Sequence, residues 1–223
     1  LGLVGSEMCI RDRVVVPETT SEVARQLIRA EGAELIVHGE SWFEANAYVQ
    51  ESLAGDEAFV HPSDHPLLWQ GHSSLIDEVV QCGIKPSVVV LSVGGGGLLC
   101  GAVEGMQRVG WHDVPVLAME TEGAESFAAA RAAGRAVRLP AITSIASSLG
   151  ARQVCDQALT WADQHPVISE VVSDAAALIA CERILQDHRL LVEPACGAAL
   201  AAVTESSKPV SYTHLTLPTT VRV

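Results

Sequence analysis

Four consecutive glycines, Gly94 to Gly97, form the stretch whose residue types and spacing best fit a binding function. Glycine allows positive φ angles and lets a ligand approach the backbone closely. The preceding residues 88–93, V-V-V-L-S-V, are typical of a strand covered on both faces in a parallel sheet. Residues 98–107 can continue as a helix, so the glycines precede a helix N-terminus. The unpaired N–H groups and the dipole at that terminus favour an anion, typically a phosphate.

The spacing around these glycines excludes one common phosphate-binding motif and weakens another. A P-loop needs Lys and then Ser or Thr after its last glycine, whereas Gly101 is followed by Ala and Val. A dinucleotide-binding fingerprint needs glycine at its sixth position, which is Leu99 or Cys100 here. Glu120 lies where a ribose-binding acid could fall, so a dinucleotide remains an alternative. A packing turn without a ligand is a second alternative, although ordering four glycines costs much conformational entropy.

Composition and charge narrow the class of protein. The 223 residues are 48% hydrophobic and 18% charged, which is enough for one large or two small cores. The formal net charge of −13 argues against nucleic acid as a partner. No apolar run approaches the roughly 18 residues of a membrane helix, so no membrane partner is expected. The six scattered cysteines, without a C-x-x-C pair, predict reduced and mostly buried thiols of a cytoplasmic protein.

The two ends of the chain differ from its middle. The sequence begins L-G-L-V-G-S-E-M-C-I-R-D-R and ends V-S-Y-T-H-L-T-L-P-T-T-V-R-V, and both stretches resemble translated sequencing-adapter sequence. We therefore expect residues 1–13 to be a non-native leader and residues 206–223 a non-native tail, with the chain a fragment of a longer protein. Ordinary frayed termini are the alternative.

The middle of the chain alternates strands and helices, which implies parallel sheets. A partial small α/β domain is expected over residues 14–62, and a large α/β domain with the phosphate-binding loop over residues 63–205. The expected strands are 14–16, 35–37, 59–60, 88–93, 115–119 and 167–172. The expected helices are 22–31, 42–53, 74–81, 98–107, 124–133, 143–149, 156–164, 175–186 and 194–203. Asp174 is expected to cap the helix that follows it.

A loop rich in His, Pro and Asp precedes the large domain's first helix. His61 and His65 are four residues apart, a spacing that suits a metal ion on a helix. Pro62 and Pro66 argue against a helix there, and no third ligand has an obvious spacing. A polar loop is therefore favoured over a zinc site.

Several motifs spread over residues 14–203 form a recognisable set. They are V-V-V-P-E-T-T (14–20), D-H-P-L-L-W-Q-G-H (64–72), S-V-G-G-G-G-L-L-C-G (92–101), M-E-T-E-G-A-E-S-F (119–127), S-D-A-A-A-L (173–178) and V-E-P-A-C-G-A-A-L-A-A-V (192–203). This set resembles the L-serine dehydratase/L-threonine deaminase family. The resemblance implies an α/β fold of the pyridoxal-phosphate-dependent, tryptophan synthase β-like type, in which flanking helices cover a parallel sheet; the small domain is incomplete here.

The resemblance also implies an activity, cofactors and partners. The family uses pyridoxal 5′-phosphate to convert serine to pyruvate, or threonine to 2-oxobutanoate, with release of ammonia. Its substrate is a small amino acid, and its members suggest a homodimer. Whether serine or threonine is preferred is not readable from these residues.

Two sets of site residues follow from matching the family's motifs to this sequence. The phosphate-binding turn is matched by Gly94, Gly95, Gly96, Gly97 and Leu98. The site of a monovalent cation, usually potassium, is matched by Gly94, Glu120, Ala124, Leu149 and Ala151. Without the resemblance, Glu120 would be interpreted as a polar strand end. Cys196 is interpreted as a packed thiol rather than a reactive one, because nothing nearby in the sequence would lower its pKa.

No catalytic residue is assigned, because the chemistry needs a lysine amine that the matching segments do not contain. The two lysines, Lys85 and Lys208, both precede a proline, and neither lies in the family's Ser-x-Lys segment. The chain itself is therefore expected to be inactive. A nucleotide-binding oxidoreductase domain and a non-catalytic relative of the same fold remain as alternatives.

Overall fold

The computed structural model describes residues 13–53 and 57–204, and the chain divides into two compact units, residues 1–60 and 61–223. The expected non-native leader lies outside the described residues except for Arg13, and the expected tail lies wholly outside them. Within the described ranges, no helix is both long and apolar enough to cross a membrane.

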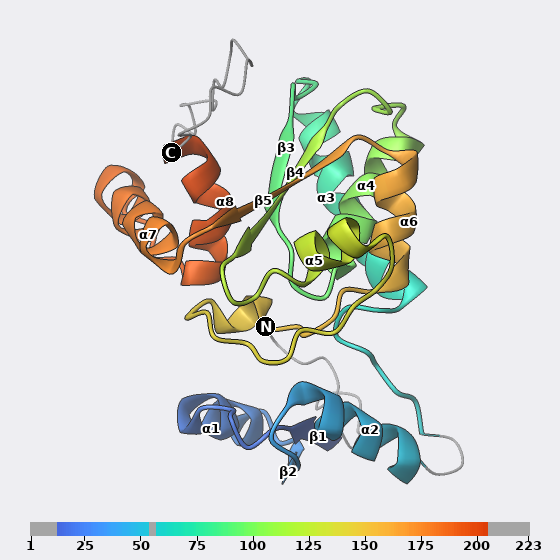
Figure 1. Cartoon of the computed structure of the whole chain (residues 1–223), viewed down its shortest axis with the longest axis vertical. Helices are drawn as coiled ribbons and strands as arrows, with labels where there is room; N and C mark the ends of the chain where they lie inside the picture. The colour runs from blue at the N-terminus through green and yellow to red at the C-terminus, as the bar shows by residue number, and fades with distance from the viewer. Residues whose placement is uncertain (1–12, 54–56, 205–223) are drawn as a thin grey trace. The chain divides into compact units, whose positions relative to one another are not determined.

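The first unit contains a two-stranded parallel sheet and two helices (Figure 1). β1 (Arg13–Val16) pairs with β2 (Glu34–Val37), and α1 (Glu22–Ala30) connects them. α2 (Trp42–Ser52) follows β2. Ser21 caps α1, because its Oγ accepts a hydrogen bond from the Ala24 N–H at 3.3 Å. The first four elements of the predicted β-α-β-α-β unit are present in the predicted order.

The third strand expected in this unit, at residues 59–60, does not form. Residues 57–60 are irregular, and Glu57 contacts β1 through an ion pair with Arg13 at 2.8 Å. The two apolar residues at 59–60 are too few to form a strand on their own. The strand cannot continue through Pro62, because proline has no N–H to donate to a neighbouring strand.

The second unit is built on a three-stranded parallel sheet in the order β3-β4-β5. Helices α7 and α8 lie on one side of the sheet, and α3, α4 and α6 lie on the other (Figure 1). The strands are β3 (Val89–Ser92), β4 (Val116–Thr121) and β5 (Val167–Val172). The helices are α3 (Pro66–Gln81), α4 (Gly97–Arg108), α5 (Ser126–Ala133), the 3₁₀ helix η2 (Ser147–Leu149), α6 (Asp156–Gln164), α7 (Asp174–His188) and α8 (Pro194–Thr204).

The central strand of this sheet is β4, so the predicted strand at residues 88–93 lies beside the centre of the sheet and not at it. Among the described residues, β4 pairs with both neighbours and β3 pairs with β4 alone. Leu91 is buried and Val89 is half-buried. An apolar run indicates that a strand is covered, but helices can supply that cover as well as strands, so the run does not give a position in the sheet.

The main core lies between the sheet and helices α3, α4 and α6. Its fully buried members include Leu99, Val103 and Met106 of α4 and Val116 of β4. Smaller clusters rich in alanine pack α8 against η2 and α7. The small residues let the backbones approach closely: a Cβ on Gly197 would collide with the Ala177 carbonyl oxygen.

Two helix starts differ from the sequence-based expectation. α3 begins at Pro66, eight residues before the predicted start, because proline is tolerated in the first helical turn, where its missing N–H has no partner to lose. Ser173, not Asp174, caps α7; its Oγ accepts a hydrogen bond from the Ala176 N–H at 3.2 Å. The Asp174 carboxylate instead accepts hydrogen bonds from the Ser144 hydroxyl at 2.6 Å and the Ile145 N–H at 3.0 Å.

Two other helices are shorter than predicted. The helix expected at 124–133 begins at Ser126, because Gly123 has a φ of 86° and a turn bonds the Ala124 N–H to the Thr121 carbonyl oxygen. The helix expected at 143–149 is reduced to η2.

The cysteines are less uniformly buried than predicted. Cys100 and Cys155 are buried, whereas Cys82 and Cys196 are exposed. The interpretation of Cys196 as a packed thiol is therefore wrong. α8 turns the neighbouring Gly197 inward, and the side chain one position earlier on the helix lies on the outer face.

Candidate functional site

The tetraglycine segment forms a tight turn between β3 and α4. Gly96 is the N-cap of α4 and has a φ of 92°, a left-handed conformation that favours glycine. The first backbone hydrogen bond of α4 runs from the Cys100 N–H to the Gly96 carbonyl oxygen at 2.9 Å. The N–H groups of Gly97, Leu98 and Leu99 precede that bond and have no partner within the helix. They are therefore positioned to donate to an anion, as predicted from the sequence.

Each glycine also lets a neighbouring segment approach the turn. A Cβ on Gly96 would lie 2.9 Å from Ala158 Cβ and 3.0 Å from Cys155 Sγ. A Cβ on Gly97 would lie 2.6 Å from the Ser63 carbonyl oxygen, and one on Gly94 would lie 3.1 Å from Leu149 Cα. The packing role considered from the sequence is thus real, and it coexists with a free helix N-terminus.

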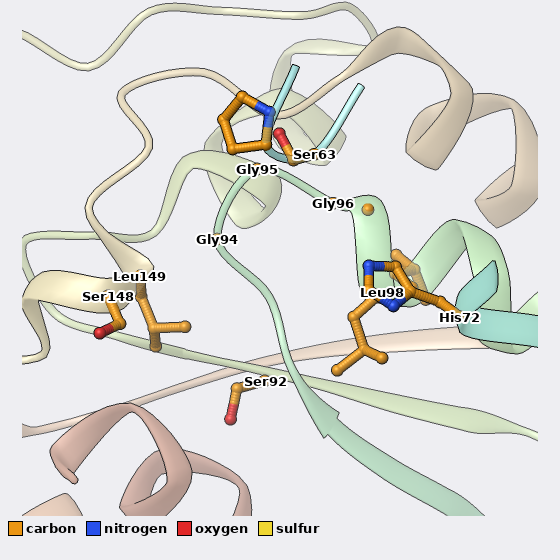
Figure 2. Close-up of a pocket in the computed structure, with 12 residues that line it drawn as sticks. Ser63, His72, Ser92, Gly94, Gly95, Gly96, Leu98, Ser148 and Leu149 are labelled. Atoms are coloured by element: carbon orange, nitrogen blue, oxygen red, sulfur yellow. The ribbon is translucent and has the colours of Figure 1, made fainter. Parts of the chain in front are cut away.

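A cavity of about 220 Å³ opens beside the turn. Figure 2 shows Ser63 above the glycines, Leu149 and Ser148 on one side, and the His72 ring beside Leu98 on the other. The lining residues are Pro62, Ser63, His72, Ser92, Gly94, Gly95, Gly96, Gly97, Leu98, Leu99, Ser148 and Leu149. None of the described residues that line the cavity is Lys or Arg, so a phosphate bound here would be held by backbone N–H groups and the dipole of α4.

Three serines supply the hydroxyl groups of the cavity lining. Ser92 donates to the Ala195 carbonyl oxygen at 2.6 Å, and Ser148 donates to Glu193 Oε2 at 2.8 Å. These bonds join the cavity wall to the first turn of α8 and to the residue that precedes it. The third serine, Ser63, is held by the loop that precedes α3.

That loop is folded by its histidines. The Nδ1 atom of His61 accepts hydrogen bonds from the N–H groups of Ser63 at 3.1 Å and Asp64 at 2.7 Å. The Nδ1 atom of His65 accepts from Leu67 N–H at 3.2 Å, and the Trp69 indole donates to the Ser63 carbonyl oxygen at 2.8 Å. Burial lowers the pKa of His61, which favours this neutral acceptor form. The described part of the chain has no group of three or more His, Cys, Asp and Glu that could hold a metal ion.

Sequence analysis did not single out Ser63, His72, Ser92 or Ser148. His72 and Ser92 lie within motifs that carried the family resemblance, so a signal for them was present. Ser63 and Ser148 are separated from the glycines by roughly thirty to fifty residues of chain, and no local pattern indicates contacts of that range.

Glu120 is a fully buried residue of β4 whose carboxylate caps α5. Its Oε1 accepts from the Phe127 N–H at 2.7 Å, and its Oε2 accepts from the Ala128 N–H at 2.8 Å. Burial raises the pKa of Glu120 to about 7, although these two hydrogen bonds oppose the rise. In the part of the chain that the structure describes, no Lys or Arg pairs with this carboxylate. A buried carboxylate without a cationic side chain fits the donor set of a cation site.

The structure brings the other predicted cation ligands close to the glycine turn. Gly94 packs against Leu149, and the Ala151 N–H donates to the Leu149 carbonyl oxygen at 2.8 Å. Ala124 belongs to the same buried cluster as Leu149. Glu120 is linked to this group through α5, whose first residue, Ser126, donates its hydroxyl to the Gly94 carbonyl oxygen at 3.4 Å.

Lys85 lies at the end of the sheet opposite the glycine turn. Its Nζ pairs with Asp113 Oδ1 at 2.7 Å, and these residues precede β3 and β4 respectively. The glycine turn follows the C-terminal end of β3. Lys208 lies outside the described residues. The described lysine therefore does not reach the cavity.

Comparison with known proteins assigns the chain to a family. The model of the pyridoxal-phosphate dependent enzyme family matches residues 1–212, and the chain belongs to this family. The free helix N-terminus and the cavity fit the phosphate of that cofactor. The fold is the tryptophan synthase β-like fold expected from the motifs, with parallel sheets and flanking helices. Because the chain belongs to this family, the alternative interpretation as a nucleotide-binding oxidoreductase domain is discarded.

Two curated relatives are similar over most of this chain. L-serine dehydratase/L-threonine deaminase from Bos taurus is 49% identical over 197 residues, which are 87% of this chain and 60% of the relative. Serine dehydratase-like protein from Mus musculus is 51% identical over 193 residues, which are 85% of this chain and 58% of the relative. The chain thus spans about 60% of the length of these relatives.

A solved structure gives the same assignment. A fungal L-serine ammonia-lyase from Rhizomucor miehei superposes with a TM-score of 0.82 at 38% identity, covering 89% of this chain and 64% of that one. Maize serine racemase superposes with a TM-score of 0.81 at 21% identity, which supports the fold alone.

Proposed function

We propose that this chain is the phosphate-binding part of a pyridoxal-phosphate-dependent L-serine/L-threonine ammonia-lyase. The parent enzyme would deaminate serine to pyruvate or threonine to 2-oxobutanoate. The observation that carries the proposal is the N-terminus of α4 facing a cavity in whose described lining there is no Lys or Arg. When bound, pyridoxal phosphate supplies the electron sink that lets an amino acid lose its α-proton and then its β-hydroxyl group.

Within this proposal the chain's own residues bind and orient the cofactor. Gly94, Gly95, Gly96, Gly97 and Leu98 form the turn whose N–H groups hold the phosphate. Ser63 and Ser148 line the same cavity, and the Ser148 hydroxyl is held by Glu193. Leu98 and Leu149 contribute apolar walls that exclude water.

A potassium ion is proposed at the junction of the turn, η2 and α5. Its ligands would be oxygen atoms of Gly94, Glu120, Ala124, Leu149 and Ala151. The proposal is supported by the packing of Gly94 on Leu149 and by the buried carboxylate of Glu120. A cation there would fix Gly94, and so hold the turn in the conformation that binds phosphate.

The proposed substrate is a small amino acid, and the proposed setting is a cytoplasmic homodimer. Neither nucleic acid nor a membrane has a role in this proposal. The chain alone is expected to lack lyase activity, because Lys85 lies at the far end of β3.

Replacing Gly96 with alanine tests the phosphate site. We expect Gly96→Ala to weaken binding of pyridoxal phosphate roughly tenfold or more, because the new methyl group collides with α6 and strains a left-handed residue. Titration of cofactor absorbance measures the affinity. The matched control is Gly110→Ala, which is equally left-handed, with a φ of 77°, but has nothing within 4 Å of the new atom.

Pyridoxal without its phosphate serves as the ligand control. It should bind weakly and equally to the original chain and to Gly96→Ala. If the Gly96→Ala and Gly110→Ala variants lost affinity for pyridoxal phosphate equally, the proposal that the glycine turn binds the phosphate would be contradicted.

Replacing Glu120 with alanine tests the cation. In a longer protein that contains this sequence and deaminates serine, we expect potassium to raise the activity and Glu120→Ala to abolish most of that rise. The rate of pyruvate formation is compared in potassium chloride and in choline chloride at equal ionic strength. Unchanged potassium dependence in the variant would show that the cation assignment is wrong.

A further inference from the structure

Two buried cysteine thiols meet directly behind the phosphate-binding turn. Cys100 lies in the first turn of α4, Cys155 is the N-cap of α6, and their sulfur atoms are 3.7 Å apart. Cys100 is 0% exposed and Cys155 is 7% exposed. The two residues are far apart in the sequence, so their contact is a product of the fold.

Both cysteines hold the turn through their backbones. The Cys100 N–H donates to the Gly96 carbonyl oxygen at 2.9 Å, and the Cys155 N–H donates to the Gly95 carbonyl oxygen at 3.1 Å. The Cys155 sulfur also lies 3.0 Å from the position that a Cβ on Gly96 would occupy. A movement of either cysteine is therefore transmitted to the glycines that face the cavity.

The two thiols differ in character. The sulfur–sulfur hydrogen bond and burial raise the pKa of Cys100. The same hydrogen bond lowers the pKa of Cys155, which is also the more exposed of the two. Cys155 is thus the better nucleophile, and Cys100 is placed to react with it next.

We propose that Cys100 and Cys155 are a site of reversible oxidation, at which a peroxide converts the two thiols to a disulfide that displaces the phosphate-binding turn. The Cys155 thiolate attacks one peroxide oxygen, the O–O bond breaks, and water leaves after protonation, which gives a sulfenic acid. The Cys100 sulfur then attacks the Cys155 sulfur and releases a second water. Two thiols are oxidised and one hydrogen peroxide is reduced to two waters.

The size of the movement follows from the bond that forms. A disulfide is about 2.05 Å long, so the two sulfur atoms must approach by about 1.7 Å from their present 3.7 Å. The core around them is closely packed, and it transmits such a shift instead of absorbing it. The hydrogen bonds to Gly95 and Gly96 are the nearest contacts that can change.

The test uses the 223-residue chain with its other thiols removed. Cys9, Cys82, Cys181 and Cys196 are each replaced by serine, and the protein is treated with a small excess of hydrogen peroxide. Mass spectrometry of the unreduced digest detects a Cys100–Cys155 linkage, and hydrogen exchange of peptides covering residues 94–100 follows the turn. Peptides from β5 serve as the internal reference.

We expect the linkage to form, to be reversed by dithiothreitol, and to speed exchange in residues 94–100 while β5 is unchanged. Affinity for pyridoxal phosphate should fall roughly fivefold, as expected when one hydrogen bond to the turn is weakened. A Cys100→Ala version of the same chain should show neither the linkage nor the change in exchange.

Two results would overturn the proposal. One is that both thiols remain free under conditions that oxidise the exposed Cys82 of the original chain. The other is that the linkage forms but exchange in residues 94–100 does not change. Both readouts are independent of the cofactor and of lyase activity, so they also distinguish failure of this proposal from failure of the proposed function.

Discussion

Backbone groups, more than charged side chains, define the candidate phosphate site at the scale of single residues. The glycine run predicted a phosphate turn, and the turn forms at a free helix N-terminus. The sequence could not show why four glycines are needed, because the reason lies in distant segments. Ser63, Cys155 and Leu149 each occupy the space that a side chain on the turn would fill.

Glu120 shows how a residue's role can escape sequence analysis. Three roles were considered: a ribose-binding acid, a polar strand end and a cation ligand. The structure adds a fourth, because both carboxylate oxygens cap α5. Helix capping by a residue several positions before the helix depends on the return path of the chain after β4, which no local pattern encodes.

A buried histidine predicts how stability depends on pH. The His165 Nε2–H donates to the Val114 carbonyl oxygen at 2.8 Å, and its Nδ1 accepts from the Gln107 amide at 3.0 Å, so the ring is neutral. Burial lowers the pKa of His165 below its ordinary value of about 6.5. The unfolded chain therefore binds a proton more readily, and the free energy of unfolding should fall as the pH decreases below about 6.5.

His165→Gln should remove the part of the pH dependence that His165 causes, while the glutamine amide still provides a donor to the Val114 carbonyl oxygen. Urea unfolding at several pH values between 7.5 and 5 measures the effect as a difference between the original chain and the variant. His188→Gln, at the exposed end of α7, is the control and should leave the pH dependence intact. The same pH dependence with and without His165 would contradict the prediction.

At the scale of elements, local patterns predicted most helices and strands but not their partners. β5 and α6 have the predicted bounds, because alternating composition and flanking turn residues mark them clearly. The order of strands, the missing third strand at residues 59–60 and the early start of α3 were not predicted. Each depends on contacts between segments or on a proline whose position in a helix decides whether it is tolerated.

The caps at the start of α7 give a prediction for an element. Ser173→Ala should lower the free energy of unfolding by about 1 kcal/mol, because the Ala176 N–H loses its partner. Asp174→Ala should cost more, because the Ser144 hydroxyl and the Ile145 N–H both lose an acceptor. Ser74→Ala, on the exposed face of α3, is the matched control and should be nearly neutral. Denaturant unfolding measures all three, and a neutral Ser173→Ala would refute the cap.

At the scale of the whole molecule, the sequence motifs predict the family and, with it, the fold. The tryptophan synthase β-like fold and the similarity to L-serine dehydratase/L-threonine deaminase are confirmed. The chain divides into a smaller and a larger unit, because most contacts between its residues lie within one unit or the other. The matched motifs contain no lysine that could lie near the cavity. Lys85, which lies outside them, is paired with Asp113 away from the cavity.

The position of Lys85 leads to a prediction for the entire chain. The 223-residue polypeptide should bind pyridoxal phosphate weakly and reversibly at the turn, and it should not form pyruvate from serine. In open α/β sheets, ligands bind beyond the C-terminal ends of the strands, whereas Lys85 precedes β3 and is paired with Asp113. The whole of β3, four residues that each advance the chain by about 3.3 Å, lies between Lys85 and the glycine turn.

Absorbance spectra with pyridoxal phosphate, followed by borohydride reduction and peptide mapping, provide the measurement. Reduction should leave Lys85 largely unmodified, because a reversible phosphate contact without a nearby amine forms no covalent bond to the cofactor. Lys85→Arg, which keeps the ion pair to Asp113 but cannot be labelled, is the control and should bind the cofactor as the original chain does. Stoichiometric labelling of Lys85 together with pyruvate formation would mean that the lysine reaches the cavity, and both the site geometry and the expected inactivity of the chain would have to be abandoned.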